Sequence, residues 1–177
     1  MKSIKKFLII LMMFVVFSAA FAVTADAAET EYKTYTDKKF GYSIEYPDIF
    51  KESEQYEDGD GNSNFVLTTD EYDLTVLGGK NDGAYDGNAL LKEATNIEED
   101  DFGYVYGVEA LPDTARSGAD FYTLKYVTDR PGPEAIAHVY GVVNKNVKAV
   151  FEFRYSQSDK EQFKEMIAHM EKSLKLK

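Results

Sequence analysis

The sequence predicts an α+β fold in which an antiparallel β-sheet is covered by helices. Several short runs alternate apolar and polar residues, which is typical of strands with one buried face. Two of these runs flank an asparagine-containing turn and predict a hairpin. The last segment instead carries the helical period and predicts an amphipathic C-terminal helix. Strands joined mostly as hairpins, with one middle and one terminal helix, favour this class over an alternating parallel fold.

The first 27 residues predict a signal peptide. Lys2, Lys5 and Lys6 precede an apolar stretch over residues 7–23, and Ala25-Asp26-Ala27 offers small residues at the two sites that a signal peptidase must accommodate. We expect cleavage near Ala27. An uncleaved anchor is the alternative, because the apolar stretch approaches the ~17 to 25 residues that cross a bilayer. No cysteine follows, so a lipoprotein anchor is excluded, and we expect a secreted or periplasmic protein without a stable membrane anchor.

The remaining chain predicts one acidic domain. We expect a flexible lead-in over residues 28–34 and a single domain over residues 35–177. Without the signal peptide the chain carries 17 Lys and Arg against 30 Asp and Glu, a net charge of −13. Such a surface argues against nucleic acid and anionic lipid as partners. The absence of cysteine excludes disulfides, thiol nucleophiles and thiolate zinc sites.

Seven strands and two helices can be placed from these patterns. Strand-like alternation covers residues 40–46, 65–67, 72–76, 102–108 and 122–126. The clearest hairpin joins residues 135–143 to residues 147–155 across Asn144-Lys145-Asn146, since asparagine tolerates the positive φ of a tight turn.

The stronger helix is predicted over residues 158–174, where Ser158 and Glu161 have the spacing of a capping box. A weaker helix is predicted over residues 88–98. Its inward side chains would be Leu90, Leu91, Ala94 and Ile97.

Residues 35–50, YTDKKFGYSIEYPDIF, resemble the opening hairpin of PsbP-like domains, and the late order of long strand, hairpin and closing helix is similar to that fold. That superfamily includes the extrinsic subunit of the photosynthetic oxygen-evolving complex, a Ran-binding nuclear import factor and many exported bacterial proteins. The resemblance implies an accessory or binding protein. No metal ligand or partner-contact residue of the photosynthetic members matches a position in this chain, so no site residue follows from it.

The loop over residues 58–64 predicts the one candidate metal site. Its alternate oxygen-bearing side chains could surround a calcium ion, and they belong to Asp58, Asp60, Asn62 and Asn64. However, Ser63 stands where an EF-hand loop has glycine, and Thr69 where it has a bidentate glutamate. The alternative is an ordinary solvated hairpin loop, which favours the same residue types.

Three further acidic segments have two interpretations, as additional oxygen ligands of a cation site or as solvated surface. They are residues 81–83, 86–88 and 98–101. Neither histidine has a sequence neighbour that completes a catalytic or metal-binding arrangement, so we expect His138 to pack at the edge of the core and His169 to lie at the surface. No nucleophile-elbow or phosphate-loop motif occurs.

Three functional hypotheses follow. The first is an exported, non-enzymatic accessory or binding domain that acts through protein contacts at the cell envelope and needs no cofactor. The second is a calcium-binding version of that module. The third is a small hydrolase that uses two carboxylates, which needs a cleft with two converging acids.

Overall fold

A computed structural model describes residues 30–50, 52–99, 105–129, 132 and 134–177. The predicted signal peptide lies outside these residues, as do Asp100 and Asp101 of the acidic run and Phe102 and Tyr104 of one predicted strand. Within the described part of the chain, no helix is long and apolar enough to cross a membrane.

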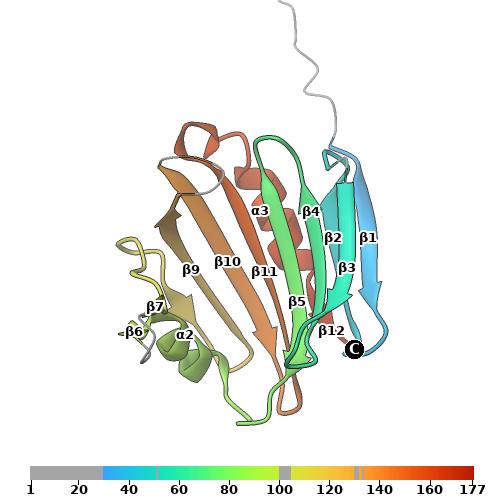
Figure 1. Cartoon of the computed structure of the whole chain (residues 1–177), viewed down its shortest axis with the longest axis vertical. Coiled ribbons are helices and arrows are strands. Elements are labelled where there is room, and N and C mark those ends of the chain that lie inside the picture. Colours follow the sequence, from blue (N-terminus) through green and yellow to red (C-terminus); the bar gives the residue numbers. More distant parts are fainter. Residues whose placement is uncertain (1–29, 51, 100–104, 130–131, 133) are drawn as a thin grey trace, which may run out of the picture.

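Seven strands form the main antiparallel sheet, in the order β3-β4-β5-β11-β10-β9-β8 (Figure 1). Its strands are β3 (Glu52–Glu57), β4 (Ser63–Thr68), β5 (Asp73–Lys80), β8 (Arg116–Ser117), β9 (Phe121–Thr128), β10 (Ala135–Val143) and β11 (Val147–Ser156). A second sheet has the order β1-β2-β12 and consists of β1 (Tyr32–Asp37), β2 (Tyr42–Pro47) and β12 (Lys175–Leu176). The short strands β6 (Glu98–Glu99) and β7 (Val105–Tyr106) pair with each other. The predicted α+β class is confirmed.

The hairpin of β10 and β11 is confirmed across its whole length. Val143 pairs with Lys148 next to the turn, and Ala135 pairs with Ser156 at the other end. The Asn144 side chain closes the turn, because its Oδ1 accepts hydrogen bonds from the main-chain N–H groups of Asn146 and Val147, both at 2.9 Å. This is the local bonding that favours asparagine in turns.

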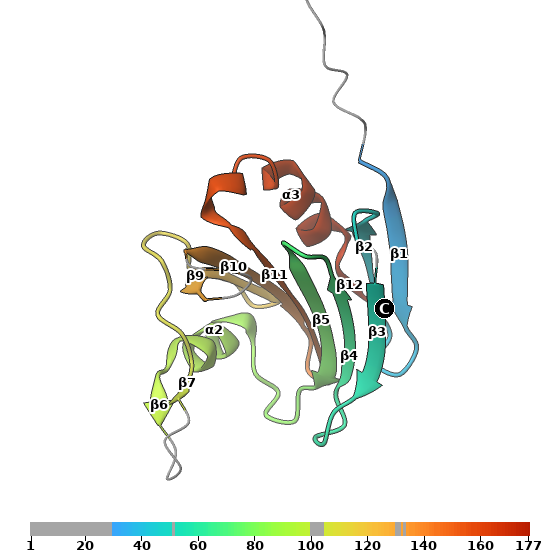
Figure 2. The same ribbon diagram turned by 45° about the horizontal axis from the view of Figure 1, so that its top comes forward.

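The main core lies between the sheet and α3 (Lys164–Ser173), which crosses the face of β11 and β5 (Figure 2). Met166, Ile167 and Met170 supply the apolar stripe of the helix, and Phe153 on β11 packs edge-to-face on Phe163 with ring centroids 5.1 Å apart. A smaller core lies on the opposite face, where α2 (Gly87–Thr95) buries Leu90 against β9 and β10. Each helix thus covers only part of one face.

The C-terminal helix begins later than predicted. Residues 157–159 form the 3₁₀ turn η1 (Gln157–Asp159), and regular α-helix starts only at Lys164. The predicted capping box from Ser158 is wrong, because Ser156 caps the 3₁₀ turn and no side chain caps α3 at Phe163. The Ser158 hydroxyl instead bonds Asp159 Oδ1 at 3.1 Å. Serine and aspartate side chains compete locally with helix formation in this way.

The other boundaries also shift. Asp86 caps α2 through a 2.8 Å bond from Ala89 N, and the helix ends at Thr95, so Ile97 is not an inward residue but is 56% exposed. β1 begins at Tyr32, inside the predicted lead-in, because Tyr32 pairs with Pro47. The chain is therefore held in the small sheet three residues before the predicted domain boundary.

Candidate functional site

A cleft of about 590 Å³ lies between α3 and the half of the sheet that α3 leaves uncovered. Its floor includes Arg116 on β8, Lys125 on β9, His138 on β10 and Tyr155 on β11. Strand periodicity puts these side chains on one face, and the register places Lys125 directly opposite His138. Its wall is the flank of α3 that includes Glu171.

His138 is buried at the floor of the cleft with only 5% of its surface exposed. Its Nε2 lies 2.8 Å from Glu171 Oε1 on α3. Burial lowers the pKa of the imidazole below its usual value, so the ring is neutral at pH 7. A carboxylate only accepts, so the tautomer is assigned as Nε2–H donating to Glu171. Nδ1 is then an acceptor, and it has no partner among the described residues.

Tyr155 provides a second unsatisfied polar group. Its side chain is fully buried, and its Oη has no hydrogen-bond partner within the described parts of the chain. Burial raises the pKa of the phenol, which therefore stays protonated and keeps a free donor. Buried polar atoms are rarely left without partners, so two such residues on one cleft indicate a site rather than plain core.

Four cationic side chains line the same cleft, and none forms an ion pair with another described residue. They are Arg116, Lys125, Lys160 and Lys164. Burial lowers the pKa of Lys125, and the positive charges of Lys160 and Arg116 act in the same direction. The carboxylates on the cleft are Asp113, Glu161 and Glu171, of which Glu171 is bonded to His138. Cations thus outnumber carboxylates here, against the trend of an acidic protein.

The hydroxyl groups of the two threonines in the cleft are held by the main chain. Thr123 Oγ1 donates to Val139 O at 2.8 Å, and Thr114 Oγ1 donates to Leu111 O at 2.7 Å. Thr114 also accepts a 3.1 Å bond from Lys125 N, which fixes its loop to β9. Neither hydroxyl bonds to His138, so neither is activated as a nucleophile needs to be.

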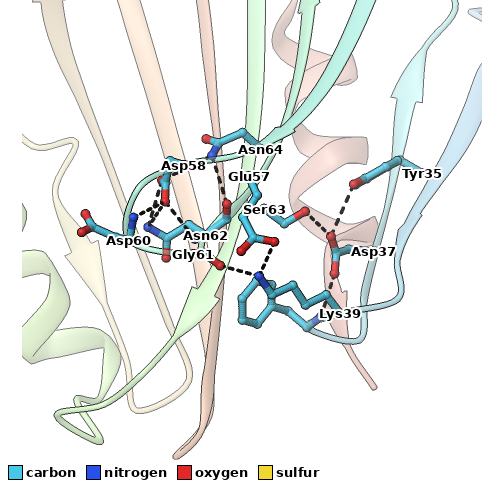
Figure 3. Close-up of polar contacts among 11 residues, drawn as sticks. Tyr35, Asp37, Lys39, Glu57, Asp58, Asp60, Gly61, Asn62, Ser63 and Asn64 are labelled. Carbon is cyan, nitrogen blue, oxygen red and sulfur yellow. Dashed lines mark hydrogen bonds and ion pairs between the residues drawn. The ribbon is translucent and has the colours of Figure 1, made fainter.

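The predicted calcium loop is the turn between β3 and β4, shown in Figure 3. Asp58 Oδ1 accepts main-chain hydrogen bonds from Asp60 at 3.0 Å and Asn62 at 2.9 Å. The side-chain amides of Asn62 and Asn64 donate to Asp58 Oδ2 at 3.0 and 3.4 Å. These bonds lower the pKa of the Asp58 carboxyl. N–H donors thus occupy the lone pairs that a cation requires.

The four predicted ligands are therefore only partly brought together. Asp58, Asn62 and Asn64 meet, whereas the Asp60 carboxylate points away in Figure 3 and contributes only its main-chain N–H. Among the described residues, no three acidic or histidine side chains converge as a metal site would require. Calcium binding by this loop stays a prediction.

A second set of bonds ties the same turn to the opening hairpin. Lys39 Nζ donates to Gly61 O at 2.8 Å and pairs with Glu57 at 2.6 Å. Ser63 Oγ donates to Asp37 Oδ2 at 2.5 Å, and Asp37 is itself buried at the end of β1. Figure 3 shows these contacts linking the two sheets. The turn is a structural junction.

The remaining acidic segments also have structural partners where they are described. Buried Asn81 donates to Tyr85 O at 2.8 Å and Asn144 O at 2.7 Å, and Asp86 caps α2. His169 is partly exposed, as predicted for a surface histidine, and its Nε2 lies 2.6 Å from Glu45 Oε2. These residues do not join the cleft.

Comparison with known proteins identifies the fold. No protein-family model and no curated protein matches the chain. The solution structure of the cyanobacterial PsbP protein (CyanoP) of Synechocystis matches 92% of this chain and 99% of its own, with a TM-score of 0.56 and 13% identity. The chain has a PsbP-like fold. This agrees with the resemblance of residues 35–50. A Bacteroides thetaiotaomicron structure is also similar, over 82% of this chain and 48% of its own, with a TM-score of 0.46 and 16% identity.

The cleft itself was not predicted from sequence. Lys125 and His138 are 13 positions apart and meet through strand pairing, while Glu171 reaches His138 from a helix 33 positions further along. The run over residues 122–126 gave no signal, because alternation places Lys125 with Thr123 on the polar face of that strand.

Proposed function

We propose that this chain is an exported, non-enzymatic accessory domain that acts through contacts with another protein at the cell envelope. The signal-peptide pattern of residues 1–27 supports export. The PsbP-like fold supports an accessory role, since the opening hairpin resembles that of a superfamily of accessory and binding proteins. Catalysis has to be judged from the cleft, because fold alone does not define function.

The observation that carries the non-enzymatic role is the chemistry of the cleft. Its threonine hydroxyls donate to main-chain carbonyls. Of the three carboxylates on the cleft, Glu171 is bonded to His138 at 2.8 Å. Hydrolysis by an activated hydroxyl needs a hydroxyl that is bonded to a base. The cleft is built to hold a polar group.

Exposed apolar side chains near the short β6–β7 ladder support a protein contact. Val105 on β7 is 63% exposed, and Ile97 directly precedes β6. Clustered apolar exposure is typical of contact surfaces. We therefore expect the partner to meet the molecule at this end.

Site-specific photo-crosslinking in cells tests the partner. A photoreactive amino acid in place of Val105 should give one discrete crosslinked species in the envelope fraction. The same group in place of Lys145, in the hairpin turn between β10 and β11, should give none and serves as the control. An absence of crosslinks from both Val105 and Ile97 would contradict the proposed contact.

Export is tested separately. The N-terminal sequence of the protein recovered from outside the cytoplasmic membrane should begin near Ala28. Retention of the apolar stretch in the membrane fraction would instead show an anchored protein.

A further inference from the structure

The cleft beside α3 has a polar lining that neither the proposed accessory role nor the PsbP-like fold explains. Its lining combines four cationic side chains, which have no ion-pair partner among the described residues, with His138 and Tyr155, two buried residues that have unsatisfied polar atoms. Elsewhere in the described chain Lys33, Lys39 and Arg154 each pair with a carboxylate. Other strand lysines such as Lys148 also have no ion-pair partner in the described chain, so the cleft cations stand out because they gather around one cavity.

We propose that the cleft between α3 and strands β8–β10 binds a small organic anion through Arg116 and Lys125, with the group's carboxylate or phosphate lying over the floor formed by His138 and Tyr155.

Geometry favours an anion at this point. Arg116 pairs with Thr123, which neighbours Lys125 on the same face of β9, so the two cations lie one strand apart over the floor. Lys160 and Lys164 add positive charge from the α3 side. An arginine and lysines around one cavity are the donors that recognise carboxylate and phosphate groups.

Size and charge favour a small ligand over a polymer. A volume of about 590 Å³ is within the range of ordinary small-molecule sites, roughly 300 to 1,000 Å³. The net charge of −11, or −13 without residues 1–27, repels an extended polyanion at long range, whereas a small anion needs only the local field of the cleft. Asp113 and Glu161 on the cleft also disfavour a densely charged ligand.

The buried polar atoms of Tyr155 and His138 indicate which groups a bound ligand would carry. Tyr155 Oη is a donor without a partner among the described residues and with almost no accessible surface, so an anionic oxygen would accept its hydrogen bond only after a small shift of the side chains around it. His138 Nδ1 is an acceptor buried in the same way, and after such a shift it would suit a hydroxyl on the same ligand. A hydroxy acid and a phosphorylated sugar share this chemistry.

Calorimetric titration with citrate, inorganic phosphate and neutral sorbitol, at pH 7 and constant ionic strength, tests the inference. We expect citrate or phosphate to bind and sorbitol not to bind. Lys125→Met should weaken anion binding by about tenfold or more, as should Arg116→Gln, because each removes a charge-assisted hydrogen bond.

Lys148→Met is the matched control, since Lys148 lies on β11 outside this cleft and also has no ion-pair partner in the described chain. Its anion affinity should stay within about twofold of the original. Binding of citrate alone or phosphate alone supports the inference and identifies the head group. Binding of neither anion overturns it, and so does an equal loss in Lys125→Met and Lys148→Met. The partner contact near Val105 is unaffected by either result, because crosslinking tests it independently.

Discussion

The β3–β4 turn and the α3 cleft are both rich in polar side chains, but they differ in whether those side chains have partners. In the turn, Asp58 accepts hydrogen bonds from Asp60 and Asn62, and Asp37 at the end of β1 accepts bonds from Phe40 N and Ser63 Oγ. In the cleft, Tyr155 Oη and His138 Nδ1 have no partner, and Lys125 has no counter-ion among the described residues.

Whether polar side chains have hydrogen-bond partners distinguishes a structural cluster from a candidate site more clearly than the types of residue do. The turn has the acidic composition of a calcium site, yet its polar side chains hydrogen-bond to one another and stabilise the junction of two sheets. The cleft has no sequence motif, yet it keeps donors and cations at a stability cost that core packing does not explain. Tyr42 Oη is also buried without a partner among the described residues but does not line this cleft, so unsatisfied polar groups beside several cations are the better guide to a site.

Asp37→Ala should cause the largest loss of stability. The Asp37 carboxylate accepts bonds from Phe40 N at 2.7 Å, Ser63 Oγ at 2.5 Å and Tyr35 Oη at 3.4 Å, and its removal leaves three partly buried donors unpaired. We expect the free energy of unfolding to fall by about 3 kcal/mol in urea titrations. Asp60→Ala is the control, with a change within about 0.5 kcal/mol, because the Asp60 carboxylate points away from the network. Equal effects of the two changes would contradict a structural junction.

Tyr155→Phe should act in the opposite direction. The substitution removes a buried hydroxyl without a partner and keeps the ring that packs near Phe153 and Phe163. We expect a gain of about 1 kcal/mol in the free energy of unfolding. Tyr126→Phe is the matched control and should lower stability, because Tyr126 Oη donates to Glu152 Oε2 at 2.7 Å. A clear loss for Tyr155→Phe would show that its hydroxyl is satisfied in the folded protein.

The pH dependence of stability should show the burial of His138. Burial lowers the pKa of the imidazole in the folded state, so below about pH 6.5 the unfolded chain binds more protons and folding stability falls as pH falls. Lys125 and Arg116 oppose the protonated ring, while Glu171 favours it. His138→Phe should make the denaturation midpoint less sensitive to pH between about pH 7.5 and 5.

His169→Gln, on the same helix as Glu171, is the control for that change and should leave most of the slope in place, since His169 is partly exposed. An unchanged slope in His138→Phe would show that His138 is not the titrating group.

Calcium should have the smallest effect. Saturating the native state at a hundred times the dissociation constant would add about 2.7 kcal/mol. We expect no change in the melting temperature between calcium and chelator, because N–H donors hold Asp58. A rise that Asp58→Ala abolishes would instead establish the calcium-binding alternative.

Strong local patterns in the sequence predicted much of the fold. The β10–β11 hairpin follows from alternation and Asn144, and residues 35–50 resemble the family whose fold the chain has. The start of α3 was mispredicted because Ser156 and Asp159 bond locally before the helix begins. The cleft depends on register and on where α3 crosses the sheet, which are long-range properties that no local pattern in this chain encodes.

A crystal structure of the protein grown with citrate would show whether the α3 cleft binds an anion. We expect citrate in this cleft, with a carboxylate within hydrogen-bond distance of Lys125 Nζ and the Arg116 guanidinium. We expect no ion at the Asp58 turn when calcium is present. An empty cleft with the anion bound elsewhere would contradict the proposed anion site, and a calcium ion held by Asp58 and Asn62 would contradict a purely structural turn.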